Sequence, residues 1–468
     1  MSQLPADCLN EIFEYLEDEV ISNSCLSINS LWCEVSVRIL WRNVRNCKTL
    51  IACLPNESKE ILHKNKIIIS TLNTKPPYFN YISLIKTFSI HNIDCIIKNV
   101  LQNYQSITPQ SLNHKKYIVA KEIFKSLMNQ ISLRELYFNS YKIIDIPSIT
   151  FTSYPGAKDC LKCLSRLSCR SDIYSEFFYQ LSQICHHIQY LGIIFEKVIS
   201  NGLKDLISVQ KNLKHLYIMQ SYDCEDLTDI YHSITKLPNT LIKFELYGGR
   251  HNIPLLFISK FTNLQELVLS FYIYNDSFEY FKKLQYVTFP HLKILKFKFS
   301  YPRYELIKFL ENNGKNLKEL YIRHSYGDNS LNLAIAKFCP NLRKYFTIFN
   351  NELESLKTIF ISCKYLESIE IWCGDEYLND KEVLELIVKF SPRNFCELKI
   401  YYVIDARSEI LPEELEKFFI DWKNRIPQKS LSFIITKGSR AKSLEIKLEN
   451  MKVIEKYKKL GIIKKFDC

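Results

Sequence analysis

The sequence predicts an α/β fold in which one strand–helix unit repeats along most of the chain, after a small helical module. Three observations lead to this prediction. A short apolar phrase recurs, at intervals of 23–29 residues from Leu161 onward. Helical periodicity fills the segments between its copies, and the first 46 residues do not fit this repeat. Such self-similarity is typical of solenoids, whose units stack because one unit cannot cover its own apolar strand face.

The phrase reads apolar-x-x-apolar-x-apolar, and its last three positions alternate as the side chains of a β-strand do. The segments between copies have helical spacing, as in 302–312, 330–338 and 380–390, where Asp380 stands at the expected N-cap. We therefore expect parallel strands on the concave side of a solenoid and helices on its convex side. Clear copies begin at Ile85, Leu133, Ile188, Leu213, Leu241, Leu264, Leu292, Leu317, Leu366 and Phe395, and weaker ones at Leu161 and Leu342.

This pattern resembles the leucine-rich repeat, over roughly residues 81–435. Longer units near 91–132 and 401–430 indicate insertions or caps. Residues 47–80 precede the first copy and have helical spacing, which predicts a stiff helical joint rather than a loose tether. Residues 436–468 predict a C-terminal capping helix over Ser443–Leu460 and a last strand. The basic side of this helix has a second interpretation as a membrane or nucleic-acid surface, which we consider less favourable.

The first 46 residues have apolar side chains at helical intervals in three short segments, the first of them after a proline suited to a helix start. A module of this size is too small to be securely stable by itself, and its remaining apolar surface favours a partner. The pattern comprises Leu4-Pro5, then Ile12-Phe13-x-x-Leu16, then Cys25-x-x-Ile28-Asn29-x-x-Trp32, and a closing Leu40-Trp41.

These residues resemble an F-box. The resemblance implies that the module docks on an adaptor of the SKP family, and through it joins a cullin-RING ubiquitin ligase (an SCF complex). Several of the same side chains, Leu16 and Trp32 above all, have an alternative role in holding the three helices together. The adaptor-contact and module-core set is Leu4, Pro5, Leu9, Ile12, Phe13, Leu16, Ile28 and Trp32.

The strand side of the solenoid is the predicted surface for a target protein. Within each phrase, the residue between the last two apolar positions and the residue after them are expected to point outward. Aromatic and basic side chains are frequent at these positions, which suits a protein interface and favours an acidic or phosphorylated target segment. Besides Tyr137, Met219 and Lys399, the positions hold the candidate target-contact residues Tyr217, Tyr247, Lys296, Lys298, Tyr321, Arg323, Trp372 and Tyr401.

Catalytic and metal chemistry finds little support in the sequence. The usual nucleotide, hydrolase and metalloprotease motifs are missing, as is the Cys/His array of a RING, so we expect no enzyme activity and no cofactor. Several cysteines recur three residues before a phrase, which the repeat explains better than a metal does. The most zinc-like cluster, for which we nevertheless predict no metal, is Cys160, Cys163, Cys169, Cys185, His186 and His187.

The chain carries 62 Lys and Arg against 50 Asp and Glu. Nucleic-acid binding would need basic residues clustered on one face together with residues that read bases, and the sequence does not indicate such a face. We therefore expect no nucleic acid as partner. No apolar stretch has the length of a membrane helix, which predicts a soluble protein of the cytoplasm or nucleus. Two functions remain open from the sequence. One is the substrate-recognition subunit of an SCF-type ligase, and the other is a non-catalytic scaffold whose repeats bind a protein without any role in ubiquitination.

Overall fold

The computed structural model describes residues 4–16, 20–44, 46–67, 77–102, 109–138, 150–224, 227–237, 239–248, 255–270, 281–322 and 329–468. The chain forms two compact units. Unit 1 comprises Met1–Cys224 and Asp229–Pro238, and unit 2 comprises Glu225–Thr228 and Asn239–Cys468. Arg323, one of the candidate target-contact residues, lies outside the described residues.

Unit 1 begins with the helical module. Its elements are α1 (Ala6–Phe13), the π-helical turn η1 (Ile21–Cys25) and α3 (Ser30–Leu40). Asn29 caps α3, since its side chain accepts a hydrogen bond from the backbone N–H of Trp32 at 2.9 Å. The described part of the segment after the module contains three helices, of which the first two are separated at Pro55. These are α4 (Cys47–Ala52), α5 (Asn56–Lys64) and α6 (Tyr81–Leu84).

The rest of unit 1 alternates strands with helices. Its strands pair in chain order and in parallel, β1 with β2 and so on to β5. They are β1 (Thr87–Ser89), β2 (Glu135–Phe138), β3 (Arg166–Arg170), β4 (Tyr190–Phe195) and β5 (His215–Gln220). The helices are α7 (Ile90–Gln102), α8 (Pro109–Gln130), η2 (Phe151–Ser153), α9 (Ala157–Leu161), α10 (Ser175–Ile184), α11 (Gly202–Ser208) and α12 (Thr228–Ile234).

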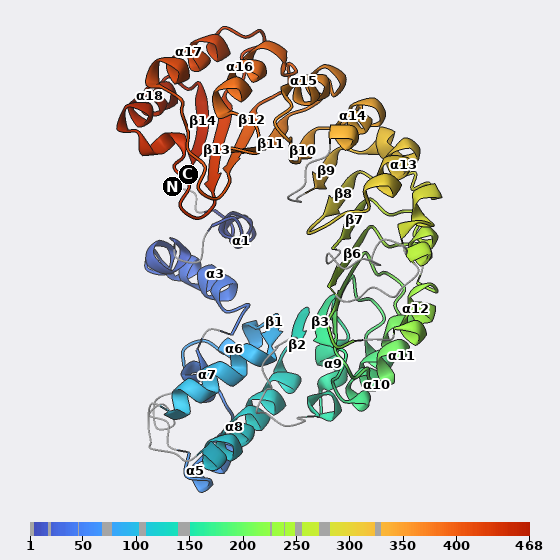
Figure 1. The fold of residues 1–468 in the computed structure, drawn as a ribbon. Helices are drawn as coiled ribbons and strands as arrows, with labels where there is room; N and C mark the ends of the chain where they lie inside the picture. Colours follow the sequence, from blue (N-terminus) through green and yellow to red (C-terminus); the bar gives the residue numbers. More distant parts are fainter. Residues whose placement is uncertain are drawn as a thin grey trace. The chain divides into compact units, whose positions relative to one another are not determined.

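Unit 2 continues the same pattern, and its helices cover one face of its parallel sheet (Figure 1). The strands are β6 (Lys243–Gly248), β7 (Glu266–Leu269), β8 (Ile294–Phe297), β9 (Glu319–Ile322), β10 (Lys344–Phe346), β11 (Ser368–Cys373), β12 (Glu397–Tyr402), β13 (Leu431–Lys437) and β14 (Ile463–Asp467). The helices are η3 (Leu255–Lys260), η5 (Leu284–Tyr286), α13 (Arg303–Asn313), η6 (Gly314–Asn316), α14 (Asn329–Phe338), α15 (Leu353–Ser362), α16 (Asp380–Phe390), α17 (Pro412–Lys423), η7 (Leu444–Ile446) and α18 (Leu448–Lys459).

The predicted α/β solenoid of parallel strands and intervening helices is therefore confirmed. One copy of the phrase was placed wrongly in the sequence. Leu167 of β3 pairs in register with Leu136 on one side and Leu191 on the other. The third copy consequently begins at Leu164 rather than at Leu161, which is the last residue of α9.

The helix at 380–390 begins one residue earlier than expected, because its N-cap is Asn379 rather than Asp380. Asn379 is the N-cap, and its side chain accepts hydrogen bonds from the N–H groups of Lys381 and Glu382. Asp380 is instead the first helical residue and is buried, with its carboxylate accepting from the hydroxyls of Tyr402 at 2.8 Å and Ser408 at 2.5 Å. A buried carboxylate requires such partners, so Asp380 joins α16 to the next repeat instead of capping it.

The periodic cysteines are buried contacts between successive repeats. The thiol of Cys185 donates to the carbonyl of Leu161 at 3.3 Å, and that of Cys363 donates to the carbonyl of Cys339 at 3.4 Å. Buried Asn and Gln side chains make the same kind of link at other repeats. The amide oxygen of Asn313 accepts from the backbone N–H of Phe289 at 2.6 Å, and its amide nitrogen donates to two backbone carbonyls. Each such side chain satisfies backbone groups that the irregular turn leaves without partners.

Asn313→Ala is expected to lower the free energy of unfolding of unit 2 by about 2–4 kcal/mol, because buried backbone groups lose their partners. Asn316→Ala is the matched control. Its side chain is exposed and donates a hydrogen bond to the carbonyl of Pro290 at 3.2 Å. Urea unfolding of both variants measures the difference, and equal losses would contradict the role given to Asn313.

The C-terminal segment forms a helix and a strand, but α18 begins at Leu448 rather than at the predicted Ser443, because the 3₁₀ turn η7 precedes it. The apolar side of α18 packs on the last repeat, where the ring of Tyr457 stacks on Phe419 with centroids 5.1 Å apart. Ile454 is also buried, whereas Lys452, Lys456 and the following lysines are exposed. β14 pairs with β13 in parallel. The segment thus covers the end of the unit 2 core with the apolar side of an amphipathic helix.

Candidate functional site

The structure separates the adaptor candidates into core and surface residues. Leu9 and Phe13 are buried at 0% and 1% exposure and form the core of the module with Ile21, Val35 and Leu40. Leu16 and Trp32 pack against this core, with the indole of Trp32 centred 5.1 Å from the ring of Phe13. The exposed members of the set are Leu4, Pro5, Ile12 and Ile28.

Helix α1 has apolar side chains on two sides. Leu9 and Phe13, four residues apart, face the core. Cys8 and Ile12, also four residues apart, are exposed, and Ile12 is 46% exposed. Pro5 before the helix and Tyr15 after it continue this second stripe at helical spacing. An outward apolar stripe on so small a module is the kind of surface that a partner covers.

The module is joined to the first repeat by backbone pairing. The carbonyl of Arg42 accepts hydrogen bonds from the N–H groups of Lys86 and Thr87, both at 2.9 Å, so the chain after α3 pairs with the start of β1. The Arg42 side chain forms an ion pair with Glu14 at 2.6 Å. The rings of Trp41 and Tyr81 lie 4.3 Å apart. The backbone and aromatic contacts therefore connect the module to the following segment of unit 1, whereas the ion pair lies within the module.

Those target candidates that lie within described strands take outward positions, but the structure does not bring all of them to one site. Lys298 follows the end of β8. Tyr217 is on β5 in unit 1, whereas the other described candidates belong to unit 2. The face of the unit 2 sheet that its helices leave uncovered is called the open face here (Figure 1). Buried and exposed side chains alternate along β8 and β9, which places two candidates on the open face. Lys296 and Tyr321 are partly exposed, whereas the side chains before and after each of them are buried.

The lysines of the open face are paired with glutamates that the sequence reasoning did not select. Lys296 lies 2.9 Å from Glu266 on the neighbouring strand, and Lys344 lies 3.0 Å from Glu319. Lys298 is exposed, and no glutamate or aspartate among the described residues forms an ion pair with it. The sequence could have indicated these glutamates, because the third position of the phrase also points outward by strand alternation and holds Glu266 and Glu319. The paired residues on the face include Lys243, Glu245, Glu266, Lys296, Glu319, Lys344, Glu397 and Lys399.

Aromatic rings form two contacts across neighbouring strands of the open face. Tyr321 of β9 stacks on Phe346 of β10 with centroids 4.2 Å apart and an interplanar angle of 13°. Trp372 of β11 lies directly opposite Tyr401 of β12, with centroids 4.7 Å apart. Tyr321 donates its hydroxyl to Glu319 at 2.7 Å, and Tyr247 donates to Glu245 at 2.8 Å. Burial and the hydrogen bond to Glu319 raise the pKa of Tyr321, so that it stays a neutral donor.

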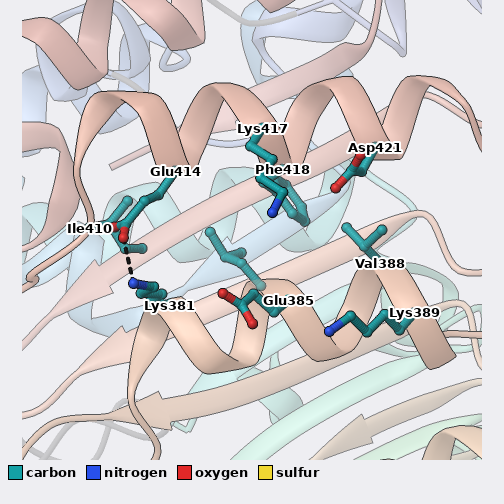
Figure 2. A pocket seen from close by; sticks show the side chains of 10 residues that line it. Lys381, Glu385, Val388, Lys389, Ile410, Glu414, Lys417, Phe418 and Asp421 are labelled. Atoms are coloured by element: carbon teal, nitrogen blue, oxygen red, sulfur yellow. Dashed lines mark ion pairs between the residues drawn. The ribbon is translucent and has the colours of Figure 1, made fainter.

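A pocket of about 260 Å³ lies on the helical side of unit 2, between α16 and α17 (Figure 2). One end carries the ion pair between Lys381 and Glu414, 2.5 Å apart, which lowers the pKa of Glu414 together with a backbone N–H bond from Leu411. Its lining combines apolar side chains with as many carboxylates as ammonium groups. No residue proposed from the sequence belongs to this lining, which comprises Lys381, Leu384, Glu385, Val388, Lys389, Ile410, Glu414, Lys417, Phe418 and Asp421.

The zinc-like cluster is dispersed over several elements. Cys163 is exposed, whereas Cys169 is buried within β3. Burial raises the pKa of the Cys160 and Cys185 thiols to about 12, so both thiols are protonated at neutral pH. In the described part of the chain, no group of three or more His, Cys, Asp or Glu side chains is arranged to hold a metal ion.

Among the described residues, no helix combines the length and the apolar character that crossing a bilayer requires. Fold and candidate site together define this chain as an α/β repeat solenoid with parallel strands and an open, partly aromatic sheet face. No protein-family model matches the chain. No curated protein sequence matches it either.

Two solved structures that match the chain do so at low similarity. The complex of Rad7 and Elc1 in yeast matches with a TM-score of 0.41 and 13% identity, over 76% of this chain and 90% of that chain. The Toll–Spätzle complex, a molecular hub in Drosophila development and innate immunity, matches with a TM-score of 0.30 and 14% identity, over 68% of this chain and 38% of that one. Similarity at this level does not define what the present chain binds.

Proposed function

We propose that this chain is the non-catalytic substrate receptor of an SCF-type ubiquitin ligase. In this function the helical module docks on a SKP-family adaptor, the repeats hold a target protein, and partners supply the ubiquitin-transfer chemistry. The observation that carries the proposal is the second apolar stripe of α1, which is exposed although the module core is already complete. The F-box resemblance of the same residues identifies the kind of partner.

The joint supports this function mechanically. A receptor has to hold its target at a set position relative to the ubiquitin-loaded enzyme. The Arg42 carbonyl bonds to Lys86 and Thr87 and the contact between Trp41 and Tyr81 fix the module on the first repeat of unit 1. A docked adaptor would therefore be held in a defined orientation relative to β1.

The test is copurification of a SKP-family adaptor and a cullin with the tagged full chain from cells. Ile12→Asp combined with Ile28→Asp places charges at side chains that are 46% and 53% exposed, so the module stays folded. We expect at least a tenfold loss of adaptor, since hot-spot residues at an interface each contribute about 2 kcal/mol or more. Val198→Asp is the matched control, because Val198 is an exposed apolar residue of unit 1 outside the module.

Full retention of the adaptor by the double variant would reject this docking surface. Failure of the unmodified chain to bind any adaptor, while it still binds a target, would replace the proposal with the scaffold function. Circular dichroism spectra of the variants show that the loss is not due to unfolding.

A further inference from the structure

Three aromatic side chains gather at the carboxyl ends of β11 and β12. Trp372 lies between Tyr401, at a centroid distance of 4.7 Å, and Tyr377, at 5.7 Å in an edge-on arrangement. Each of the three rings is partly exposed. The rings touch one another and form a continuous surface, which we call the aromatic platform (Trp372, Tyr377, Tyr401). Aromatic rings in contact offer a large, stiff apolar area at low conformational cost.

The loop that carries Tyr377 is held in place. The N–H of Tyr377 bonds to the carbonyl of Gly374 at 2.9 Å, and Cys373 bridges to Leu378 across the loop. Gly374 has a φ of +150°, and a Cβ there would collide with the side chain of Val403 in the next repeat. The loop is therefore fixed against its neighbour, and the platform is formed before any ligand binds.

Two polar groups of the platform are unused. In the described part of the chain, neither the indole N–H of Trp372 nor the hydroxyl of Tyr401 has a hydrogen-bond partner. This distinguishes Tyr401 from Tyr247 and Tyr321, whose hydroxyls are bound to glutamates. The platform thus offers hydrogen-bond donors beside an apolar surface, which suits a ligand that presents carbonyl oxygens.

The charges around the platform disfavour a phosphorylated ligand. Lys399 is paired with Glu397 at 3.3 Å, and Arg440 is paired with Asp405 at 2.8 Å. Asp375 and Glu376, in the loop of Tyr377, are exposed and have no ion pair within the described residues. The carboxylates of Asp375 and Glu376 would repel a phosphate bound here. The cations of Lys399 and Arg440 would attract it only weakly, because each is already paired with a carboxylate.

A proline-containing segment in the polyproline II conformation meets these conditions. Its flat aliphatic rings pack on aromatic side chains, its backbone makes no internal hydrogen bonds, and its carbonyls stay free to accept from the platform. Such a segment is already extended, so little conformational entropy is lost on binding. A cation cage is less suitable, because rings in direct contact leave no space for an ammonium group between their faces.

We infer that the platform of Trp372, Tyr377 and Tyr401 binds an unphosphorylated, proline-containing extended segment of the target protein. This inference rests on the proposed function and specifies the class of target. It also replaces the expectation of an acidic or phosphorylated target segment. That expectation was based on the lysines of the open face and did not include the glutamates that pair with them.

The experiment measures fluorescence anisotropy of labelled peptides titrated with the full chain. The probe is a peptide of about ten prolines, which adopts polyproline II in water. Its controls are a glycine–serine peptide of equal length and a proline peptide that ends in phosphoserine. We expect saturable binding of the proline peptide below roughly 1 mM, no binding of the glycine–serine peptide, and no gain from the phosphoserine.

Variants assign the binding to the platform. Trp372→Ala is expected to weaken binding at least tenfold, and Trp372→Phe about threefold, because phenylalanine keeps an aromatic surface but lacks the N–H donor. Tyr365→Ala, at a 52% exposed tyrosine before β11, is expected to leave binding unchanged. Binding that survives Trp372→Ala, no binding of the proline peptide, or tighter binding of the phosphoserine peptide would each overturn the inference. None of these results depends on the adaptor, so the receptor function is tested separately.

Discussion

Leu9→Asp is expected to unfold the N-terminal module while leaving the repeats folded. Leu9 is fully buried in the module core beside Phe13. Loss of a buried leucine side chain costs about 2–5 kcal/mol, and burying an unpaired carboxylate adds to that cost. A unit of this size has roughly 2–6 kcal/mol of stability in all, at about 0.05–0.15 kcal/mol per residue. The substitution therefore removes most or all of it.

Hydrogen exchange followed by mass spectrometry measures the effect. Amides of α1 and α3 should lose their protection in Leu9→Asp, whereas those of β3 to β5 should keep theirs. Ile12→Asp is the control, since Ile12 lies on the same helix but is 46% exposed, and it should leave all of these amides protected. Unchanged protection of α1 in Leu9→Asp would mean that Leu9 does not hold the module together.

This contrast has a consequence for any study of adaptor binding. A variant that unfolds the module also loses the adaptor, so a change at Leu9 or Phe13 cannot identify a contact surface. The F-box resemblance selects both kinds of residue without separating them, because a motif records which side chains recur and not which way they point. Burial in the folded module supplies that distinction, and it leaves Leu4, Pro5, Ile12 and Ile28 as the surface members.

The repeat was predictable because its apolar positions recur with the period of the fold. The error at Leu161 has a simple cause. Leu161, Leu164 and Leu167 are evenly spaced, so the first four positions of the phrase fit from Leu161 as well as from Leu164. The sixth position is Arg166 in the first segment and Cys169 in the second, and the pairing of β3 with β2 and β4 selects the second. Local spacing fixes the elements, whereas register depends on neighbours far along the chain.

The candidate site was predicted less completely for the same reason. Strand alternation predicted that Trp372 and Tyr401 point outward, but Tyr377 lies in a loop and follows no period. The pairing of Lys296 with Glu266 joins residues 30 positions apart, and the single sequence does not reveal such a partner. Outward lysines were therefore interpreted without their partners, although Lys296 and Lys344 pair with glutamates of neighbouring strands and Lys399 pairs with Glu397 of its own strand.

Asp94→Asn is expected to destabilise the long helical insertion of unit 1 by about 3–5 kcal/mol, the usual cost of breaking a buried ion pair by changing one partner. Asp94 of α7 lies 2.8 Å from the ammonium group of Lys116 on α8. The Lys116 side chain is 0% exposed and that of Asp94 is 13% exposed. The variant leaves the lysine charge buried without its carboxylate, and α7 and α8 separate more easily.

Urea unfolding and hydrogen exchange of α7 and α8 measure this loss. Glu34→Gln is the control, because its ion pair with Arg38 is exposed and such pairs contribute only about 0–1 kcal/mol. A second variant, Asp94→Leu with Lys116→Met, separates the charge from the packing. Replacement of both charges by apolar side chains is often neutral or stabilising, so this double variant should regain most of the stability that Asp94→Asn loses. If the double variant is as unstable as Asp94→Asn, then the packing of these two side chains, and not the unpaired charge, sets the stability of the insertion.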